Sequence, residues 1–219
     1  MKRGLMVVLC LVVLIISRCE AQPTKFVAEG FVELFNGALA DMRKQDLYAA
    51  EEKLRGALAL DSTFREVWLA LNEILYHTKQ KNKQKEYLKL AISRFPEDGD
   101  FQYYYGMLLQ RDELFDQAIR RYSDAILLNK ATDEKSAIGY AYYFNRGVCY
   151  YRTGKWKNSL NDFEVAVKLN DTLSYIHVNH GLALQKMGEM IIACKCWRKA
   201  RSLGDAEAVR LLGKYCKPD

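Results

Sequence analysis

The residues that could bind a nucleotide lie between Gly147 and Lys155, where one glycine is followed by a later Gly-Lys pair. A phosphate-binding loop has four residues between its glycines, and a Ser or Thr after the lysine binds magnesium. Here six residues separate Gly147 from Gly154, and Trp156 stands where the hydroxyl is required. The segment therefore does not predict a nucleotide site, and we expect no cofactor.

Two histidines, His177 and His180, stand three residues apart and would share one face of a helix, as two ligands of a zinc site can. No third ligand follows at a recognisable spacing, so we expect structural histidines and no metal. The sequence motifs of serine hydrolases, zinc proteases, dithiol redox proteins and dinucleotide-binding enzymes do not occur. We therefore expect a protein that is not an enzyme, with an unrecognised catalytic site as the alternative.

An internal repeat of 34 residues decides which elements would position any site. Each copy has an alanine in the same register, a large residue three positions before it, and a small residue at most of the positions seven and nineteen before it. Small residues let two helices approach closely while the large residue fills the gap between them. The five alanines are spaced by 34 residues except for one step of 41, and they are Ala57, Ala91, Ala125, Ala166 and Ala200.

This pattern resembles the tetratricopeptide repeat (TPR) family, in which Leu-Gly, Tyr, Ala, an aromatic residue and Ala follow one another at fixed spacing. The fourth copy is the best match, with Gly147, Tyr150, Ser159, Phe163 and Ala166 at the family's positions. The resemblance implies an all-α, right-handed superhelix of helix-turn-helix repeats, an α-solenoid. We expect a single domain over 22–219, with repeats at 31–64, 65–98, 99–132, 140–173 and 174–207.

A last amphipathic helix is expected at 205–217, after the fifth repeat. Its apolar side would carry Ala208, Leu211, Leu212 and Tyr215, with charged residues elsewhere. The terminal unit of a solenoid must cover the exposed apolar face of its neighbour. The sequence therefore predicts that this segment is a C-terminal capping helix.

The first 21 residues are typical of a secretory signal peptide. A positive head, Lys2-Arg3, precedes an apolar run of twelve residues, which is shorter than a membrane span, and small residues favour cleavage after Ala21. A lipid anchor on Cys19 is the alternative, although Arg18 is unusual before such a site. We expect an exported bacterial protein, periplasmic or secreted, with no membrane insertion after signal cleavage.

The charge of the chain excludes two classes of partner. The formal net charge is +6, and it would fall to +4 after removal of the leader, without any run of five or six like charges. Such a weakly basic chain does not suggest nucleic acid or an anionic membrane as its partner. The identity of a protein partner is not encoded in these features.

Four cysteines would remain after cleavage: Cys149, Cys194, Cys196 and Cys216. Export out of the reducing cytosol makes a disulfide plausible. The last repeat's second helix and the capping helix would run antiparallel through a turn at Gly204, which places Cys194 opposite Cys216, whereas Cys196 points away. We predict a disulfide between Cys194 and Cys216, with free thiols, a Cys-x-Cys metal site and a thiol-redox function left as alternatives.

The TPR resemblance also implies that the first helices of the repeats line a concave groove that holds a peptide or a partner protein. Aromatic residues and asparagines would line this groove, with arginines along one rim, and the family's lysine for a terminal carboxylate is missing. We therefore expect a non-catalytic scaffold of the cell envelope that binds an apolar, partly acidic segment. Thiol-redox or other enzymes, or a permanent structural subunit, are the alternatives. The predicted groove residues are Phe35, Asn36, Tyr76, Tyr103, Arg111, Phe144, Asn145, Tyr151, Arg152 and Asn179.

Overall fold

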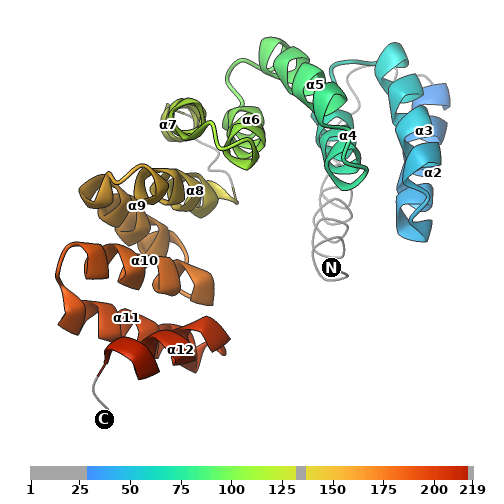
Figure 1. The fold of residues 1–219 in the computed structure, drawn as a ribbon. Helices are drawn as coiled ribbons and strands as arrows, with labels where there is room; N and C mark the ends of the chain where they lie inside the picture. Colours follow the sequence, from blue (N-terminus) through green and yellow to red (C-terminus); the bar gives the residue numbers. More distant parts are fainter. Residues whose placement is uncertain (1–28, 132–136, 217–219) are drawn as a thin grey trace. The chain divides into compact units, whose positions relative to one another are not determined.

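The computed structural model describes residues 29–131 and 137–216, and within these ranges the chain forms helices and no strands (Figure 1). The expected leader, its cleavage site and Cys19 lie outside the described residues. No described helix combines the length and apolar character needed to cross a membrane. The all-α fold class is therefore confirmed.

The chain divides into two compact units, with the boundary between Arg94 and Phe95. The prediction of one continuous domain over 22–219 stays a prediction. In unit 1, helices α2 and α4 are each followed by a helix that packs against them, and the core includes Phe31, Leu54, Leu71 and Ile74. The helices in the described residues of unit 1 are α2 (Glu29–Lys44), α3 (Leu47–Leu60), α4 (Arg65–His77) and α5 (Lys81–Arg94).

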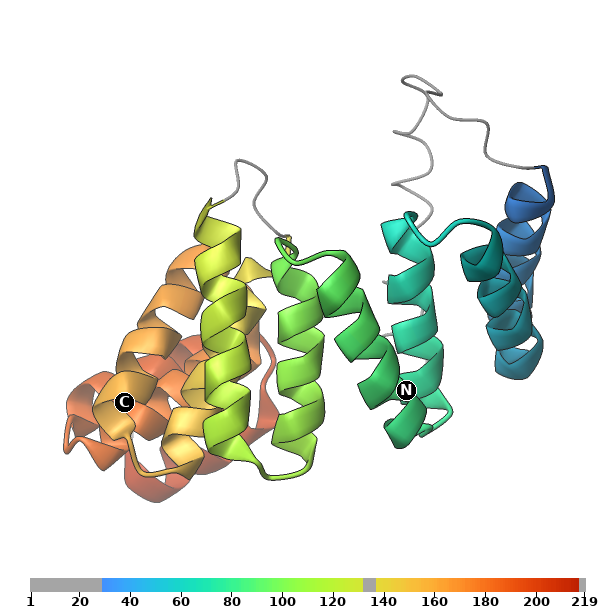
Figure 2. The same cartoon turned by 90° about the horizontal axis from the view of Figure 1, so that it is seen from above.

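The described part of unit 2, residues 95–131 and 137–216, contains three helix pairs and a final helix. Figure 2 shows α6 and α7 side by side as one such pair, and α6, α8 and α10 also contact one another in order. We call α6, α8 and α10 the first helices of unit 2. The helices are α6 (Gly99–Arg111), α7 (Phe115–Ala131), α8 (Gly139–Arg152), α9 (Trp156–Leu169), α10 (Ser174–Lys186), α11 (Met190–Ser202) and α12 (Ala206–Tyr215).

Glycine in the first helices permits the close approach within each pair of unit 2. A Cβ atom on Gly106 would lie 2.6 Å from the ring of Tyr122, and one on Gly147 would lie 2.9 Å from the ring of Phe163. Both rings are completely buried. The repeated combination of a small residue and a large one therefore fixes how the two helices of a pair fit together. The five alanines in the shared register are likewise buried, at 2% exposure or less.

The turn inside each pair uses a left-handed residue at one repeated position. Gln45, Lys79 and Glu113 have φ angles of 65°, 57° and 58°, and Gly154 and Gly188 have φ angles of 74° and 83°. Glycine adopts this conformation without the steric cost that a side chain adds. The turn geometry is therefore kept through all five pairs although only two of them have glycine.

The last helix, α12, covers the end of unit 2. Ala208, Leu211 and Leu212 are buried in one cluster with Trp197 of α11. The side chain of Asp205 accepts a hydrogen bond from the backbone N–H of Ala208 and caps the helix. The covered apolar side of α12 matches the expected role of a capping helix.

Candidate protein-binding surface

The predicted groove residues of unit 1 divide between core and surface. Phe35 is only 7% exposed, and its ring packs against Phe31 and against Phe64, which precedes α4. Asn36 is exposed, and Tyr76 is 45% exposed with its ring edge-on to His77. Phe35 is therefore a core residue of unit 1, and the structure does not place it on an open groove.

In unit 2 the predicted residue Tyr103 is also buried. It is 7% exposed because its ring contacts Tyr104 on its own helix, Tyr122 of α7 and Tyr142 of α8. The predicted residue Phe144 is half-buried, with its ring 4.8 Å from that of Tyr175 on α10. The rings of Tyr103 and Phe144 thus connect the three first helices of unit 2 and form the floor of a surface.

Three tyrosines that the sequence analysis did not single out lie on this floor: Tyr104, Tyr140 and Tyr175. We call them the tyrosine surface. Tyr175 is 39% exposed and hydrogen-bonded to Tyr140, while Tyr104 and Tyr140 are half-buried. Each tyrosine comes from a different first helix, so three helices contribute to one aromatic face. The high tyrosine content was the available sequence signal, but it did not show which tyrosines meet.

Hydrogen bonds fix the floor of the tyrosine surface. The amide nitrogen of Asn145 donates to the Tyr103 hydroxyl at 3.2 Å and to the Ala141 carbonyl at 3.0 Å. The hydroxyl of Tyr142 donates to Asp100. Since both amide hydrogens of Asn145 are used, only its oxygen is left for a partner. The predicted residue Asn179 similarly donates to the carbonyl of Tyr175, at 2.8 Å.

The phenol groups of Tyr103 and Tyr175 are neutral over the physiological pH range. Burial raises the pKa of Tyr103 and of Tyr175, and neighbouring tyrosines, including Tyr140, raise both further. A neutral phenol keeps its O–H donor as well as its acceptor oxygen. The tyrosine surface can therefore offer both aromatic contact and hydrogen bonds to a partner.

The predicted basic rim does not act as a pair of free arginines. Arg111 and Arg152 are both exposed, but Arg152 lies 3.5 Å from the Glu113 carboxylate and 5.1 Å from the centre of the Phe115 ring. The predicted residue Tyr151 is half-buried, and burial raises its pKa, with Tyr215 as a smaller cause. Arg152 is therefore engaged by the turn of the preceding repeat and not by the tyrosine surface.

The cysteines and histidines do not form a reactive site in the described residues. The sulfurs of Cys194 and Cys216 lie 1.98 Å apart, at bonding distance. The Cys196 sulfur lies 3.5 Å from Nδ1 of His180, but burial raises the pKa of Cys196 to about 11 and lowers that of His180 to about 4. Both groups are therefore neutral near pH 7, whereas a nucleophilic thiol requires the thiolate. Over the part of the chain that the structure describes, no three candidate ligands are grouped for a metal.

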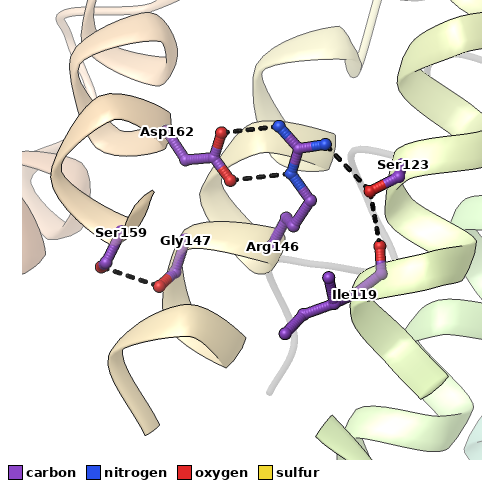
Figure 3. Close-up of polar contacts among 6 residues, drawn as sticks. All are labelled: Ile119, Ser123, Arg146, Gly147, Ser159 and Asp162. Carbon is purple, nitrogen blue, oxygen red and sulfur yellow. Dashed lines mark hydrogen bonds and ion pairs between the residues drawn. The ribbon is translucent and has the colours of Figure 1, made fainter. Parts of the chain in front are cut away.

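A polar network that the sequence analysis missed connects two repeats of unit 2 (Figure 3). The guanidinium of Arg146 donates two hydrogen bonds to the Asp162 carboxylate, both at 2.8 Å, and a third to the Ser123 hydroxyl at 2.9 Å. Ser123 in turn donates to the carbonyl of Ile119. Burial raises the pKa of Asp162, while the Arg146 hydrogen bond lowers it. The signal in the sequence was Arg146 at a position where the family pattern has leucine.

Comparisons with known proteins support the repeat assignment. Residues 140–173 match the model of the tetratricopeptide repeat family. An uncharacterised TPR repeat-containing protein of Arabidopsis thaliana is 30% identical over 118 residues, which are 49% of this chain and 14% of that protein. The chain therefore spans only a small part of this relative's length.

Solved structures show the same fold. MamA from Desulfovibrio magneticus is 13% identical with a TM-score of 0.68, over 81% of this chain and 97% of that one. PilF from Pseudomonas aeruginosa is 18% identical with a TM-score of 0.73, over 87% of this chain and 86% of that one. YrrB, described as a TPR protein with an unusual peptide-binding site, is 19% identical with a TM-score of 0.63, over 83% of this chain and 90% of that one. At these identities the likeness concerns the fold alone.

Proposed function

We propose that this chain is a non-catalytic binding protein and that the first helices of unit 2 hold a peptide segment or a partner protein. The observation that carries this proposal is the tyrosine surface, where Tyr104, Tyr140 and Tyr175, from three helices, lie around the buried Tyr103. The peptide-binding site in the printed description of YrrB is consistent with such a use of the fold. The thiol-redox alternative has no support from Cys196, whose thiol is protonated near neutral pH.

Tyrosine suits this role for physical reasons. Its ring supplies a large apolar contact with few rotatable bonds, and its hydroxyl forms a directed hydrogen bond. Residues of this kind dominate the binding energy of many interfaces when neighbours hold them in place. Here the ring of Phe144 packs against that of Tyr175 with their centres 4.8 Å apart, and the ring of Tyr103 packs against that of Tyr104 with their centres 5.3 Å apart. The surface is therefore preorganised before a partner arrives.

Site-specific photo-crosslinking in the producing cell tests the proposal. A photoreactive phenylalanine analogue at Tyr175 should give a discrete protein adduct, because that side chain is 39% exposed within the tyrosine surface. The same analogue at Leu127, 67% exposed on the second helix α7, is the matched control and should give none. An adduct at Leu127 alone would move the binding surface to the second helices.

With the crosslinked partner purified, Tyr175→Ala should weaken binding by about 1 to 3 kcal/mol, because it removes a central aromatic contact. Isothermal titration calorimetry would measure the change in Kd, and circular dichroism would check that the variant is folded. An unchanged Kd in the folded variant would contradict the assignment of the surface.

We further propose that the chain is exported and cleaved after Ala21, with the lipid anchor on Cys19 as the alternative. The support is the positive head, the apolar run and the small residues before the cleavage site. N-terminal sequencing of protein from the producing cell should begin at Gln22. A chain that begins at Met1 would contradict export by this route.

A further inference from the structure

A second surface of unit 2, separate from the tyrosine surface, is formed where first helices turn into second helices. We call it the turn edge, and its members are Phe115, Arg152, Trp156, Lys157, Lys186, Met187 and Ile191. Contacts between consecutive repeats hold it together. The guanidinium of Arg152 lies 5.1 Å from the centre of the Phe115 ring, and Nζ of Lys186 lies 5.9 Å from that of Trp156. The same contact between a cation and an aromatic ring therefore occurs twice, one repeat apart. We call each such contact between the turns of consecutive repeats a step: the first is Arg152 with Phe115, and the second is Lys186 with Trp156.

In the first of these two steps, the chain's own acidic turn supplies carboxylates. Glu113 lies 3.5 Å from Arg152, and Asp116 lies 2.9 Å from Nζ of Lys155. Phe115, between the two acids in sequence, contributes the ring beneath Arg152. Two carboxylates that flank bulky apolar residues thus form ion pairs with the two cations of the next turn, Arg152 and Lys155.

The second step keeps one of the two cations, Lys186, and the ring, Trp156, but it lacks the carboxylates of Glu113 and Asp116. At the positions of Glu113 and Asp116, one repeat later, stand Gly154 and Lys157. Lys157 and Lys186 are exposed, and neither forms an ion pair with another described residue. The acid of this step is Glu189 on the next turn, at the position of Lys155 one repeat later, and the two lysines outnumber it.

Apolar side chains at the second step are unusually exposed. Trp156 is 40% exposed, Met187 is 42% exposed and Ile191 is 78% exposed. Met187 and Ile191 lie on the same turn as Lys186, whose Nζ is 5.9 Å from the centre of the Trp156 ring. Exposed apolar residues of this size on adjoining turns are typical of an interaction site. Basic and apolar groups are therefore presented together without the two carboxylates that the first step has.

We propose that the second step of the turn edge, at Trp156, Lys157 and Lys186, binds a partner protein through a segment in which carboxylates flank bulky apolar residues. The chain's own Glu113–Asp116 turn shows the chemistry that complements such a step. The carboxylates pair with Lys157 and Lys186, and the apolar side chains lie against Trp156, Met187 and Ile191. This surface is independent of the tyrosine surface, so either can fail without the other.

The probe is the peptide acetyl-DELFDQ-amide, which copies residues 112–117. Titration into the ¹⁵N-labelled mature protein should shift the indole N–H resonance of Trp156, which is exposed, and saturate in the millimolar range. The resonances of Trp68 and Trp197 should stay in place, because these side chains are buried and donate to the carbonyls of Ser62 and Val178. The amide peptide acetyl-NQLFNQ-amide should bind at least about fivefold more weakly, since it lacks the carboxylates.

Charge reversal separates this proposal from nonspecific attraction. The double variant K157E/K186E should lose at least about tenfold in affinity for the acidic peptide. The matched control K168E/K199E changes the same charge on exposed lysines at the far ends of α9 and α11, and should bind like the parent. Equal losses in the two variants, equal binding of the two peptides, or no Trp156 shift at about 10 mM peptide would each overturn the proposal.

Discussion

Replacing Arg146 with alanine should lower the free energy of unfolding of unit 2 by about 3 to 5 kcal/mol. The Asp162 side chain is only 7% exposed, and Arg146 is its ion-pair partner at 2.8 Å. Without the guanidinium, a buried carboxylate would lose two hydrogen bonds, and the Ser123 hydroxyl would lose one. Chemical denaturation followed by circular dichroism would measure the loss.

A double variant provides the control for this result. Arg146→Met with Asp162→Leu replaces both charges by apolar groups of similar size, so no charge remains buried alone. Replacing a whole buried pair in this way is often neutral or stabilising. The double variant should therefore recover most of the stability lost in Arg146→Ala. If Arg146→Ala unfolds like the parent, the pair does not hold the repeats together.

The pH dependence of the single variant gives a second readout. Burial raises the pKa of Asp162 above its ordinary value, and the Arg146 hydrogen bond opposes this rise. Removal of Arg146 should therefore raise the pKa further. When the pKa of an acid is higher in the folded protein than in the unfolded chain, the folded protein binds its proton more readily. The free energy of unfolding then falls as the pH rises from the pKa of the unfolded chain to the pKa of the folded protein. Acidification through this range should narrow the difference in Tm between variant and parent.

Removal of the Cys194–Cys216 bond should cost about 3 kcal/mol, because the bond closes a loop over a sequence separation of 22 and restricts the unfolded chain. Cys216→Ser is the better variant, since Cys216 is half-buried whereas Cys194 is buried. The bond also fixes the end of α12, whose Leu211 and Leu212 cover Trp197. Thermal melting of the oxidised parent and the variant would measure the loss.

Cys196→Ser is the matched control for this prediction, because Cys196 is a free thiol two residues from Cys194. It should change Tm much less than Cys216→Ser does. Strong reductant should bring the parent close to Cys216→Ser. Alkylation of both Cys194 and Cys216 in protein isolated without reductant would show that the bond is absent and contradict the prediction.

The sequence by itself determined the all-α fold and the pairing within each repeat. The alanines and the large residues before them recur at fixed spacing because the two helices of one pair are joined by a short turn. Such contacts depend only on helical periodicity and on neighbours close in the chain. The same local geometry placed Cys194 opposite Cys216, across a single turn.

Only the tertiary structure decided which of the predicted groove residues are accessible. Phe35 and Tyr103 occupy the same repeat position, and both are buried because aromatic side chains further along the chain cover them: Phe64 at the end of the first repeat and Tyr142 in the repeat after that of Tyr103. The repeat period does not contain this information, since it depends on which large side chains adjacent repeats happen to present. Sequence reasoning therefore located the face and not its exposed members.

The Arg146 network and the turn edge have the same origin. Arg146 meets Asp162 within its own repeat but Ser123 in the repeat before, and Lys186 meets Trp156 only because consecutive turns lie side by side. Contacts of this kind join side chains about 20 to 40 residues apart, and their existence depends on how far one repeat is rotated against the next. That rotation is set by packing between repeats, so the structure was required to find both features.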